Sequence, residues 1–228
     1  QDALSPSDPA VPEDPAAALG EGSPAEPAPE ASVPAAQREG LVEEGGALYF
    51  YEGGRRVSGE RQIDGSWYYF DPEDGGAAVR SGFAEIPDAN LPAEWEGSKE
   101  CYYDEDGRMV KGELCLDGDW YFLDPGSGAK SYGFALLDDP GVQGGRKWCY
   151  YGPFKGDGRM VKGEACVDGK WYYLDPGSGG VTYGFALLDD PGVEGGRKWV
   201  YYGPFMADGT MRYGEQCIDG GWYYLTPG

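Results

Sequence analysis

The chain has 228 residues and carries 40 acidic against 18 basic side chains, a formal net charge of −22 with no histidine. This charge repels nucleic acid and anionic lipid, so neither is expected as a partner. Without histidine the chain lacks the usual general base and the commonest metal ligand, and we expect no metal and no other cofactor. No apolar run approaches the ~20 residues that span a bilayer, so membrane insertion is not expected.

Residues 1–47 differ in composition from the rest of the chain. They are rich in Pro, Ala and acidic residues, contain no aromatic residue or cysteine, and have Arg38 as their single basic residue. A segment with so little apolar surface to bury stays disordered, and its prolines favour an extended form. We predict a disordered acidic, proline-rich linker here, either a stalk below an upstream domain or a passive leader. Because the chain begins at Gln1, we expect it to be a processed or excised piece.

An aromatic motif recurs through the remaining residues. It begins at Trp67, Trp120, Trp171 and Trp222, with spacings of 53, 51 and 51 residues. Self-similarity at a fixed period is typical of stacked repeat architectures. With abundant glycine at turns, it predicts an all-β solenoid of stacked β-hairpins over residues 48–228.

Each period divides into two hairpin-sized units. In one unit, an aromatic strand at 147–151 is expected to turn through Asp157-Gly158 and pair with 159–164. In the other, 171–175 is expected to turn through 176–179 and pair with 181–185. This division gives seven units and an eighth at Trp222 that lacks its second strand. Strand alternation places Trp148 and Tyr150 on one face, and an isolated hairpin is marginal, so the units must stack.

The five cysteines follow the period. Cys101 and Cys115 lie in one period, and Cys149 and Cys166 take the matching places in the next. We expect a disulfide within each pair, which favours an exported protein. Cys217 remains as a free thiol or as the bridge of a dimer. The alternative is buried free thiols in a reducing compartment.

The unit from Gly163 to Leu174, Gly-Glu-Ala-Cys-Val-Asp-Gly-Lys-Trp-Tyr-Tyr-Leu, is followed by a glycine-containing turn and Tyr183-Gly184-Phe185. It resembles the cell-wall-binding repeats of Gram-positive surface proteins, which include streptococcal choline-binding modules and the repeats of glucan-binding proteins and clostridial toxins. The resemblance covers residues 48–228. It implies aromatic clefts between consecutive hairpins that bind choline on teichoic acid or a sugar on a wall polysaccharide.

The family pattern has a Gly-Trp after the second strand, and this chain replaces that tryptophan. In one kind of unit a phenylalanine takes its place, at positions 83, 134 and 185 (Phe83, Phe134 and Phe185). In the other kind a glutamate does, as Glu60, Glu113, Glu164 and Glu215. Clefts that follow a Phe keep an aromatic wall, which can hold an ammonium by cation–π attraction or a sugar by stacking. The resemblance thus implies a ligand-binding set of Phe134, Trp148, Tyr150, Trp171, Phe185, Trp199, Tyr201 and Trp222. For each of these rings, simple packing is the alternative.

The abundant carboxylates recur in Asp-Gly pairs, which are turn formers rather than catalytic pairs, so no enzyme is expected. The sequence predicts a non-catalytic, multivalent binding module that attaches a secreted protein to a cell-envelope polymer at the wall or surface of a Gram-positive bacterium. The alternatives are an adhesin or toxin-like array that binds host glycans and a ligand-free structural stalk.

Overall fold

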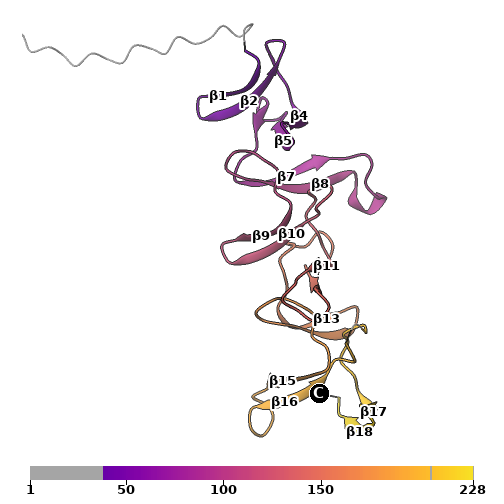
Figure 1. Cartoon of the computed structure of the whole chain (residues 1–228). Helices are drawn as coiled ribbons and strands as arrows, with labels where there is room; N and C mark the ends of the chain where they lie inside the picture. The colour runs from indigo at the N-terminus through magenta and orange to yellow at the C-terminus, as the bar shows by residue number, and fades with distance from the viewer. Residues whose placement is uncertain (1–37, 206, 228) are drawn as a thin grey trace, which may run out of the picture. The chain divides into compact units, whose positions relative to one another are not determined.

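The computed structural model describes residues 38–205 and 207–227. These residues form an all-β array of hairpins, which confirms the predicted fold class (Figure 1). The helical part of the described chain is one short 3-10 turn, η2 (Ala93–Trp95), and no helix there is long and apolar enough to cross a bilayer. Residues 1–37 of the predicted linker lie outside the described residues, so its disorder stays a prediction.

The strands are short and evenly distributed along the array. They are β1 (Gly40–Glu44), β2 (Ala47–Glu52), β3 (Arg55–Arg56), β4 (Gly59–Ile63), β5 (Ser66–Asp71), β6 (Ala77–Ala78), β7 (Gly82–Pro87), β8 (Ser98–Tyr103), β9 (Gly112–Leu116), β10 (Asp119–Leu123), β11 (Phe134–Asp138), β12 (Arg146–Tyr150), β13 (Gly163–Val167), β14 (Lys170–Leu174), β15 (Phe185–Asp189), β16 (Arg197–Tyr201), β17 (Gly214–Ile218) and β18 (Gly221–Leu225). Each sheet contains one antiparallel hairpin of consecutive strands, and two sheets add a third short strand.

The strands pair differently from the sequence-based prediction. Each aromatic strand is the second strand of a hairpin, so 170–174 pairs along its length with the preceding 163–167. The predicted pairing with 181–185 is limited to one isolated bridge, between Leu174 and Val181. The two-residue turn Asp168-Gly169 joins the two strands of the hairpin, and both residues have positive φ, 50° and 76°, as a type I′ turn requires. By the same rule β18, which contains Trp222, pairs with β17, so the eighth hairpin is complete.

The array also begins earlier than the predicted boundary at Leu48. Strand β1 starts at Gly40 and pairs with β2 from Gly40 opposite Tyr51 to Glu44 opposite Ala47. Strand β1 contains few apolar residues, and its composition is similar to that of the acidic segment before it, so composition alone did not reveal it. Its alternating burial shows that one face is nonetheless covered.

Three core clusters repeat along the array, each around one fully buried tyrosine. These tyrosines are Tyr103, Tyr151 and Tyr202. The ring of Tyr151 lies 6.0 Å from that of Phe122 on β10, and Met160 packs on the same cluster. Because Phe122 and Tyr151 belong to different hairpins, each cluster fastens one hairpin to another.

The two expected disulfides are absent, because the members of each pair lie in different surroundings. All five cysteines are described and all are free thiols. Cys101 and Cys149 are fully buried in the core clusters, whereas their expected mates Cys115 and Cys166 are exposed. Cys166 lies directly across the hairpin from Trp171, and Cys115 from Trp120. Cys217 is exposed, free and opposite Trp222.

The buried thiols behave as small apolar residues. Val200 takes the same place in the third cluster that Cys149 takes in the second. Burial raises the pKa of Cys101 to about 12 and that of Cys149 to about 11. Both side chains therefore stay protonated near neutral pH, as inert buried cysteines do.

Candidate ligand clefts between hairpins

The ring of Phe134 on β11 joins two consecutive hairpins. Its centroid lies 4.8 Å from that of Tyr150 on β12 and 5.0 Å from that of Tyr172 on β14. The hairpin register sets the first contact, since Phe134 and Tyr150 are paired across the strands. Beside this ring opens a cavity of about 290 Å³, which we call the Phe134 cleft. It is lined by Phe134, Trp148, Tyr172, Val181, Tyr183, Ala207 and Asp208.

One carboxylate gives the Phe134 cleft a negative pole. Burial and the nearby charge of Asp208 together raise the pKa of the Tyr172 and Tyr183 phenols, which therefore stay neutral. Burial opposes ionisation of Asp208, but hydrogen bonds from Thr210 and the charge of Arg212 act against it, and the pKa of that carboxyl lies below its ordinary value. Arg212 Nη2 lies 2.5 Å from Asp208 Oδ1 and shares this charge. No lysine or arginine is among the described residues that line the cleft.

A second, wider cleft adjoins Phe185 on β15. The Phe185 centroid lies 4.8 Å from that of Tyr201, 5.4 Å from that of Tyr223 and 6.4 Å from that of Trp199. All four side chains line a cavity of about 840 Å³, the Phe185 cleft, together with Lys198 and Arg212 among others. The two arrangements repeat at a spacing of 51 residues, from Phe134 to Phe185.

The cleft beside Phe83 on β7 is built the same way but holds charged side chains. The Phe83 centroid lies 5.0 Å from that of Tyr102 and 5.4 Å from that of Tyr121. The Lys130 ammonium lies 5.0 Å from the centre of the Phe83 ring and 2.5 Å from a carboxylate oxygen of Glu100. A cavity of about 430 Å³ remains here, the Phe83 cleft, and its lining includes Glu85, Trp95, Lys99, Glu100, Tyr132 and Lys155.

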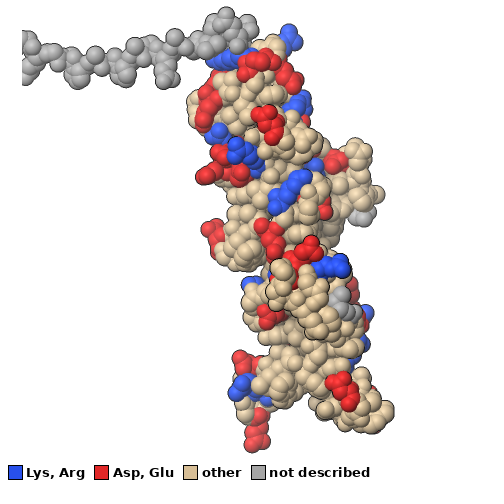
Figure 2. All heavy atoms as spheres, in the orientation of Figure 1, with Lys and Arg blue, Asp and Glu red and all other residues tan. Residues whose placement is uncertain are grey.

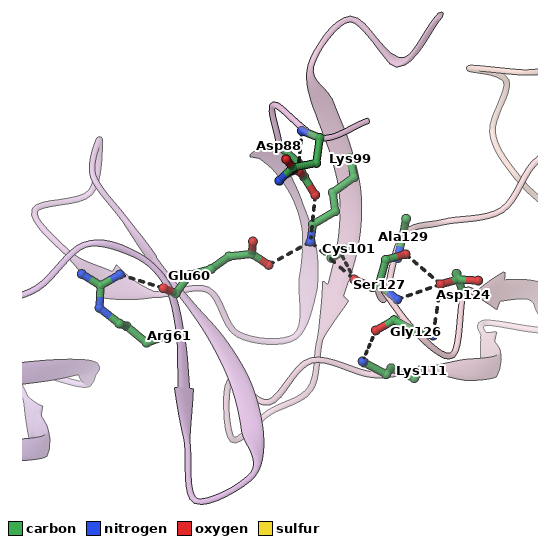
Figure 3. A network of polar contacts seen from close by, with 11 residues as sticks. Glu60, Arg61, Asp88, Lys99, Cys101, Lys111, Asp124, Gly126, Ser127 and Ala129 are labelled. Atoms are coloured by element: carbon green, nitrogen blue, oxygen red, sulfur yellow. Dashed lines mark hydrogen bonds and ion pairs between the residues drawn. The ribbon is translucent and has the colours of Figure 1, made fainter. Parts of the chain in front are cut away.

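Where glutamate replaces the aromatic wall, a lysine of another hairpin lies against it. Lys99 on β8 is nearly buried, with its Nζ 3.1 Å from Glu60 Oε1 and 3.7 Å from Asp88 Oδ2 (Figure 3). Lys111 reaches the same region and donates to the carbonyl oxygen of Gly126. The cavity that remains has a volume of only about 100 Å³. We call this arrangement a Glu-type cleft.

The Glu-type cleft recurs in the next two periods. Lys147 Nζ lies 3.8 Å from Glu113 Oε1 and 3.2 Å from Asp139 Oδ2. Lys198 Nζ lies 3.9 Å from a Glu164 oxygen and 3.2 Å from Asp190. These internal ion pairs supply both the cation and the anion of the cleft. Elsewhere on the surface in view, acidic and basic side chains are interspersed (Figure 2).

The structure divides the predicted site residues into two groups. Phe134 and Trp148 line one cleft, Phe185, Trp199 and Tyr201 line another, and Tyr150 packs on the Phe134 ring. Trp171 and Trp222 line neither cleft and are 44 % and 76 % exposed, each opposite an exposed cysteine.

Sequence reasoning missed five residues that line the Phe134 cleft: Tyr172, Val181, Tyr183, Ala207 and Asp208. The signal for Tyr172 was available, because strand alternation places it on the opposite face from Trp171. Within the described part of the chain, no group of three or more His, Cys, Asp or Glu side chains is placed to hold a metal ion.

Comparison with known proteins identifies the family. A model of the choline-binding repeat matches residues 43–83, 94–131 and 143–183, more than half of the chain. This chain belongs to the choline-binding repeat family. The resemblance drawn from the repeat motif is thereby confirmed, and the family supports a cell-wall-binding or glucan-binding module.

Two curated relatives carry similar sequences. Glucosyltransferase-S of Streptococcus mutans serotype c (strain ATCC 700610 / UA159) is 30 % identical over 181 residues, which cover 78 % of this chain and 10 % of the relative. Glucosyltransferase-S of Streptococcus downei is 27 % identical over 199 residues, covering 78 % of this chain and 14 % of the relative. The chain therefore spans about a tenth of the length of these enzymes.

A solved structure shares the fold. The crystal structure of CbpF in complex with ipratropium superposes with a TM-score of 0.59 at 24 % sequence identity, covering 78 % of this chain and 55 % of that one. At this identity the likeness concerns the fold.

Proposed function

We propose that this array is a non-catalytic module that attaches its protein to a cell-envelope polymer through open aromatic clefts between hairpins. We further propose that the group bound in the Phe134 cleft is a substituted ammonium, such as the choline of a teichoic acid. The observation that carries this proposal is the composition of that cleft. Four aromatic side chains, Phe134, Trp148, Tyr172 and Tyr183, and the carboxylate of Asp208 line a cavity of about 290 Å³, and no lysine is among its lining residues.

The chemistry of the cleft suits a soft cation. Ring faces attract an ammonium by about 0.5–2 kcal/mol per contact, more when the site is partly desolvated. Asp208 adds a negative charge at one side, although its pairing with Arg212 reduces the net field. Together, the ring contacts and the charge of Asp208 correspond to weak binding of an ammonium at one cleft. A polymer that engages the Phe134 and Phe185 clefts together gains apparent affinity through effective concentration.

A glucan is the second candidate, and the Phe185 cleft favours it. That cleft is the wider one, and Trp199 and Tyr224 at its edge are 65 % and 71 % exposed. Broad exposed ring faces suit the stacking of a sugar ring. The relatives with similar repeats are named glucosyltransferases, which is consistent with a glucan ligand.

The same reasoning supports a location outside the cell. A module for envelope polymers acts at the wall or surface, and the two curated relatives come from streptococci. We therefore propose a secreted protein of the surface of a Gram-positive bacterium. Host glycans, the ligand of an adhesin, remain the outcome to expect if envelope polymers fail.

The test uses the full chain on three solid phases: choline-bearing cell walls, the same walls stripped of choline, and an insoluble α-glucan. Retention on the first alone, reversed by free choline, supports the ammonium proposal. Retention on the glucan that choline leaves intact supports the second candidate. Failure to bind any of the three contradicts both.

The residues are tested with a matched pair of variants. Trp148→Leu removes a cleft wall and is expected to weaken choline binding about 10-fold. Trp171→Leu removes an equally accessible tryptophan that lines no aromatic cleft, since Trp148 is 37 % and Trp171 44 % exposed. Equal losses in the two variants would contradict the assignment of the Phe134 cleft.

A further inference from the structure

The Phe83 cleft and the Phe134 cleft are one construction repeated along the chain, with two key residues exchanged. Lys130 precedes Gly133 by three residues and Val181 precedes Gly184 by three. Lys130 packs on the φ-positive Gly158, where an added Cβ would lie 2.9 Å from its Cδ. Val181 packs on Gly209 in the same manner. Lys130 and Val181 thus occupy equivalent positions.

The second exchange lies on the facing strand. Glu100 directly precedes the buried Cys101 on β8, and Trp148 directly precedes the buried Cys149 on β12. The Phe134 cleft therefore has an apolar valine and a tryptophan wall. The Phe83 cleft has a lysine and a glutamate at the same two places.

The lysine holds its charge over the rings. Lys130 is 5 % exposed, and its Nζ lies 5.0 Å from the Phe83 ring centre and 5.5 Å from the Tyr132 ring centre. Its ammonium lies 2.5 Å from Glu100 Oε2, and the Tyr132 hydroxyl donates to that same oxygen at 3.4 Å. Two ring faces and one carboxylate are what a cationic ligand would need.

We infer that Lys130 is an internal occupant of the Phe83 cleft. Its ammonium takes the place over the aromatic rings that a cationic ligand takes in the Phe134 cleft, and Glu100 is the counter-ion that holds it there. The Phe83 cleft therefore does not bind the ammonium ligand, and exchanging these two residues for those of the next repeat opens it. The choice of ligand in this inference rests on the proposed function.

Two further observations agree with an occupied cleft. Charged side chains that line the space beside Phe83 already have partners within the protein: Lys99 pairs with Glu60, Lys155 with Glu96 and Glu100 with Lys130. The Phe134 cleft is lined by no lysine. The Glu-type clefts follow the same plan, since Lys99, Lys147 and Lys198 each pair with the glutamate that replaces the aromatic wall. Lysines held by a glutamate of the same chain thus recur along the array.

The first experiment measures binding stoichiometry by titration calorimetry of the full chain with choline chloride. The double variant Lys130→Val/Glu100→Trp is expected to bind one more choline than the wild type. The reciprocal variant Val181→Lys/Trp148→Glu, which closes the Phe134 cleft, is expected to bind one fewer. Circular dichroism and thermal unfolding verify that both variants fold. An unchanged stoichiometry in the folded opened variant would overturn the inference.

A second measurement does not depend on choline binding. In protein labelled with 13Cε-lysine, the Lys130 signal is identified by its loss in Lys130→Val. Ring currents should shift it upfield of the other lysines, and Phe83→Leu should move it back. Saturating choline should leave it unchanged. An ordinary shift for Lys130 would refute the internal occupant whether or not choline binds. An upfield shift in a protein that binds no choline would keep the occupant and reject the proposed ligand.

Discussion

The Phe134 ring lies 5.0 Å from the Tyr172 ring of the following hairpin, and the same pair recurs in the neighbouring periods. Phe83 and Tyr121 lie 5.4 Å apart, as do Phe185 and Tyr223. The residue that forms the wall of a cleft thus also fastens one hairpin to the next. If the clefts bind as proposed, we therefore expect stability and binding to be coupled at the phenylalanines and separable at the tryptophans.

This coupling predicts different outcomes for two truncations. Phe134→Ala should lower the free energy of unfolding by about 2 kcal/mol, because a half-buried ring and its two aromatic contacts are lost. Trp148→Ala should lower it by less than about 1 kcal/mol, since that side chain is more than a third exposed. Urea unfolding measures both values. A large loss for Trp148→Ala would show that the tryptophan is a packing residue.

The free thiols predict a simple chemical pattern. In native protein without reductant, Ellman's reagent should react with Cys115, Cys166 and Cys217, and in denaturant with two more thiols, Cys101 and Cys149. Dithiothreitol should leave the melting temperature unchanged. Cys149→Val, which copies Val200, should change the free energy of unfolding by less than about 1 kcal/mol. Fewer than five reactive thiols in denaturant would revive a disulfide.

The buried thiols also predict a loss of stability in alkali. Burial raises the pKa of Cys101 to about 12 and that of Cys149 to about 11, from an ordinary value of 9.0. Above pH 9 the unfolded chain releases these protons while the folded chain keeps them. The stabilisation is therefore complete below pH 9 and is lost as the pH rises toward 11–12, by up to about 1.4 kcal/mol per pH unit and group.

Urea unfolding between pH 8 and pH 9 measures this loss where tyrosines of the unfolded chain, with an ordinary pKa of about 10, are still mostly protonated. Cys149→Val should reduce the slope, since one of the two buried thiols is removed. An unchanged slope in that variant would show that other groups cause the alkaline loss.

Two glycines with similar φ predict a graded effect of one added methyl group. Gly169 has φ +76° and open space where a Cβ would lie, so Gly169→Ala should cost about 1 kcal/mol from backbone strain. Gly179 has φ +69°, and a Cβ there would collide with the Met160 thioether. Gly179→Ala should therefore cost about 3 kcal/mol, because overpacking adds to the strain. Thermal or urea unfolding of the pair checks the difference, and equal costs would contradict it.

The sequence predicted the repeat and its hairpins but not which strands pair. Asp157-Gly158 and Asp168-Gly169 share the same two letters, yet only Asp168 has positive φ and closes a two-residue turn. The choice depends on which neighbouring strand the aromatic strand can reach, and that is a property of the stacked array. The prediction that the Trp222 hairpin lacks a strand was wrong for the same reason, because its partner strand precedes it.

The candidate site was predicted in part. The replacement of tryptophan by Phe134 and Phe185 located the aromatic clefts, because that position follows directly from the repeat. Tyr183 and Asp208 join the Phe134 cleft from segments that follow later in the chain, so no local pattern placed them there. The prediction of two disulfides was wrong. Val200 occupies the position of Cys149 in the third period, and this exchange indicates a buried apolar position rather than a bonded cysteine.

Each cleft takes its walls from successive hairpins, and the distance from Phe134 to Phe185 is one period of 51 residues. Recombination between two copies of the period inserts or deletes whole units without breaking the register of a sheet. Each such event adds or removes one cleft with a phenylalanine wall and one Glu-type cleft together. If the clefts bind as proposed, the number of binding sites in this array therefore changes in whole steps with the length of the gene. Point substitutions at positions such as Lys130 and Glu100 would then change which clefts are open.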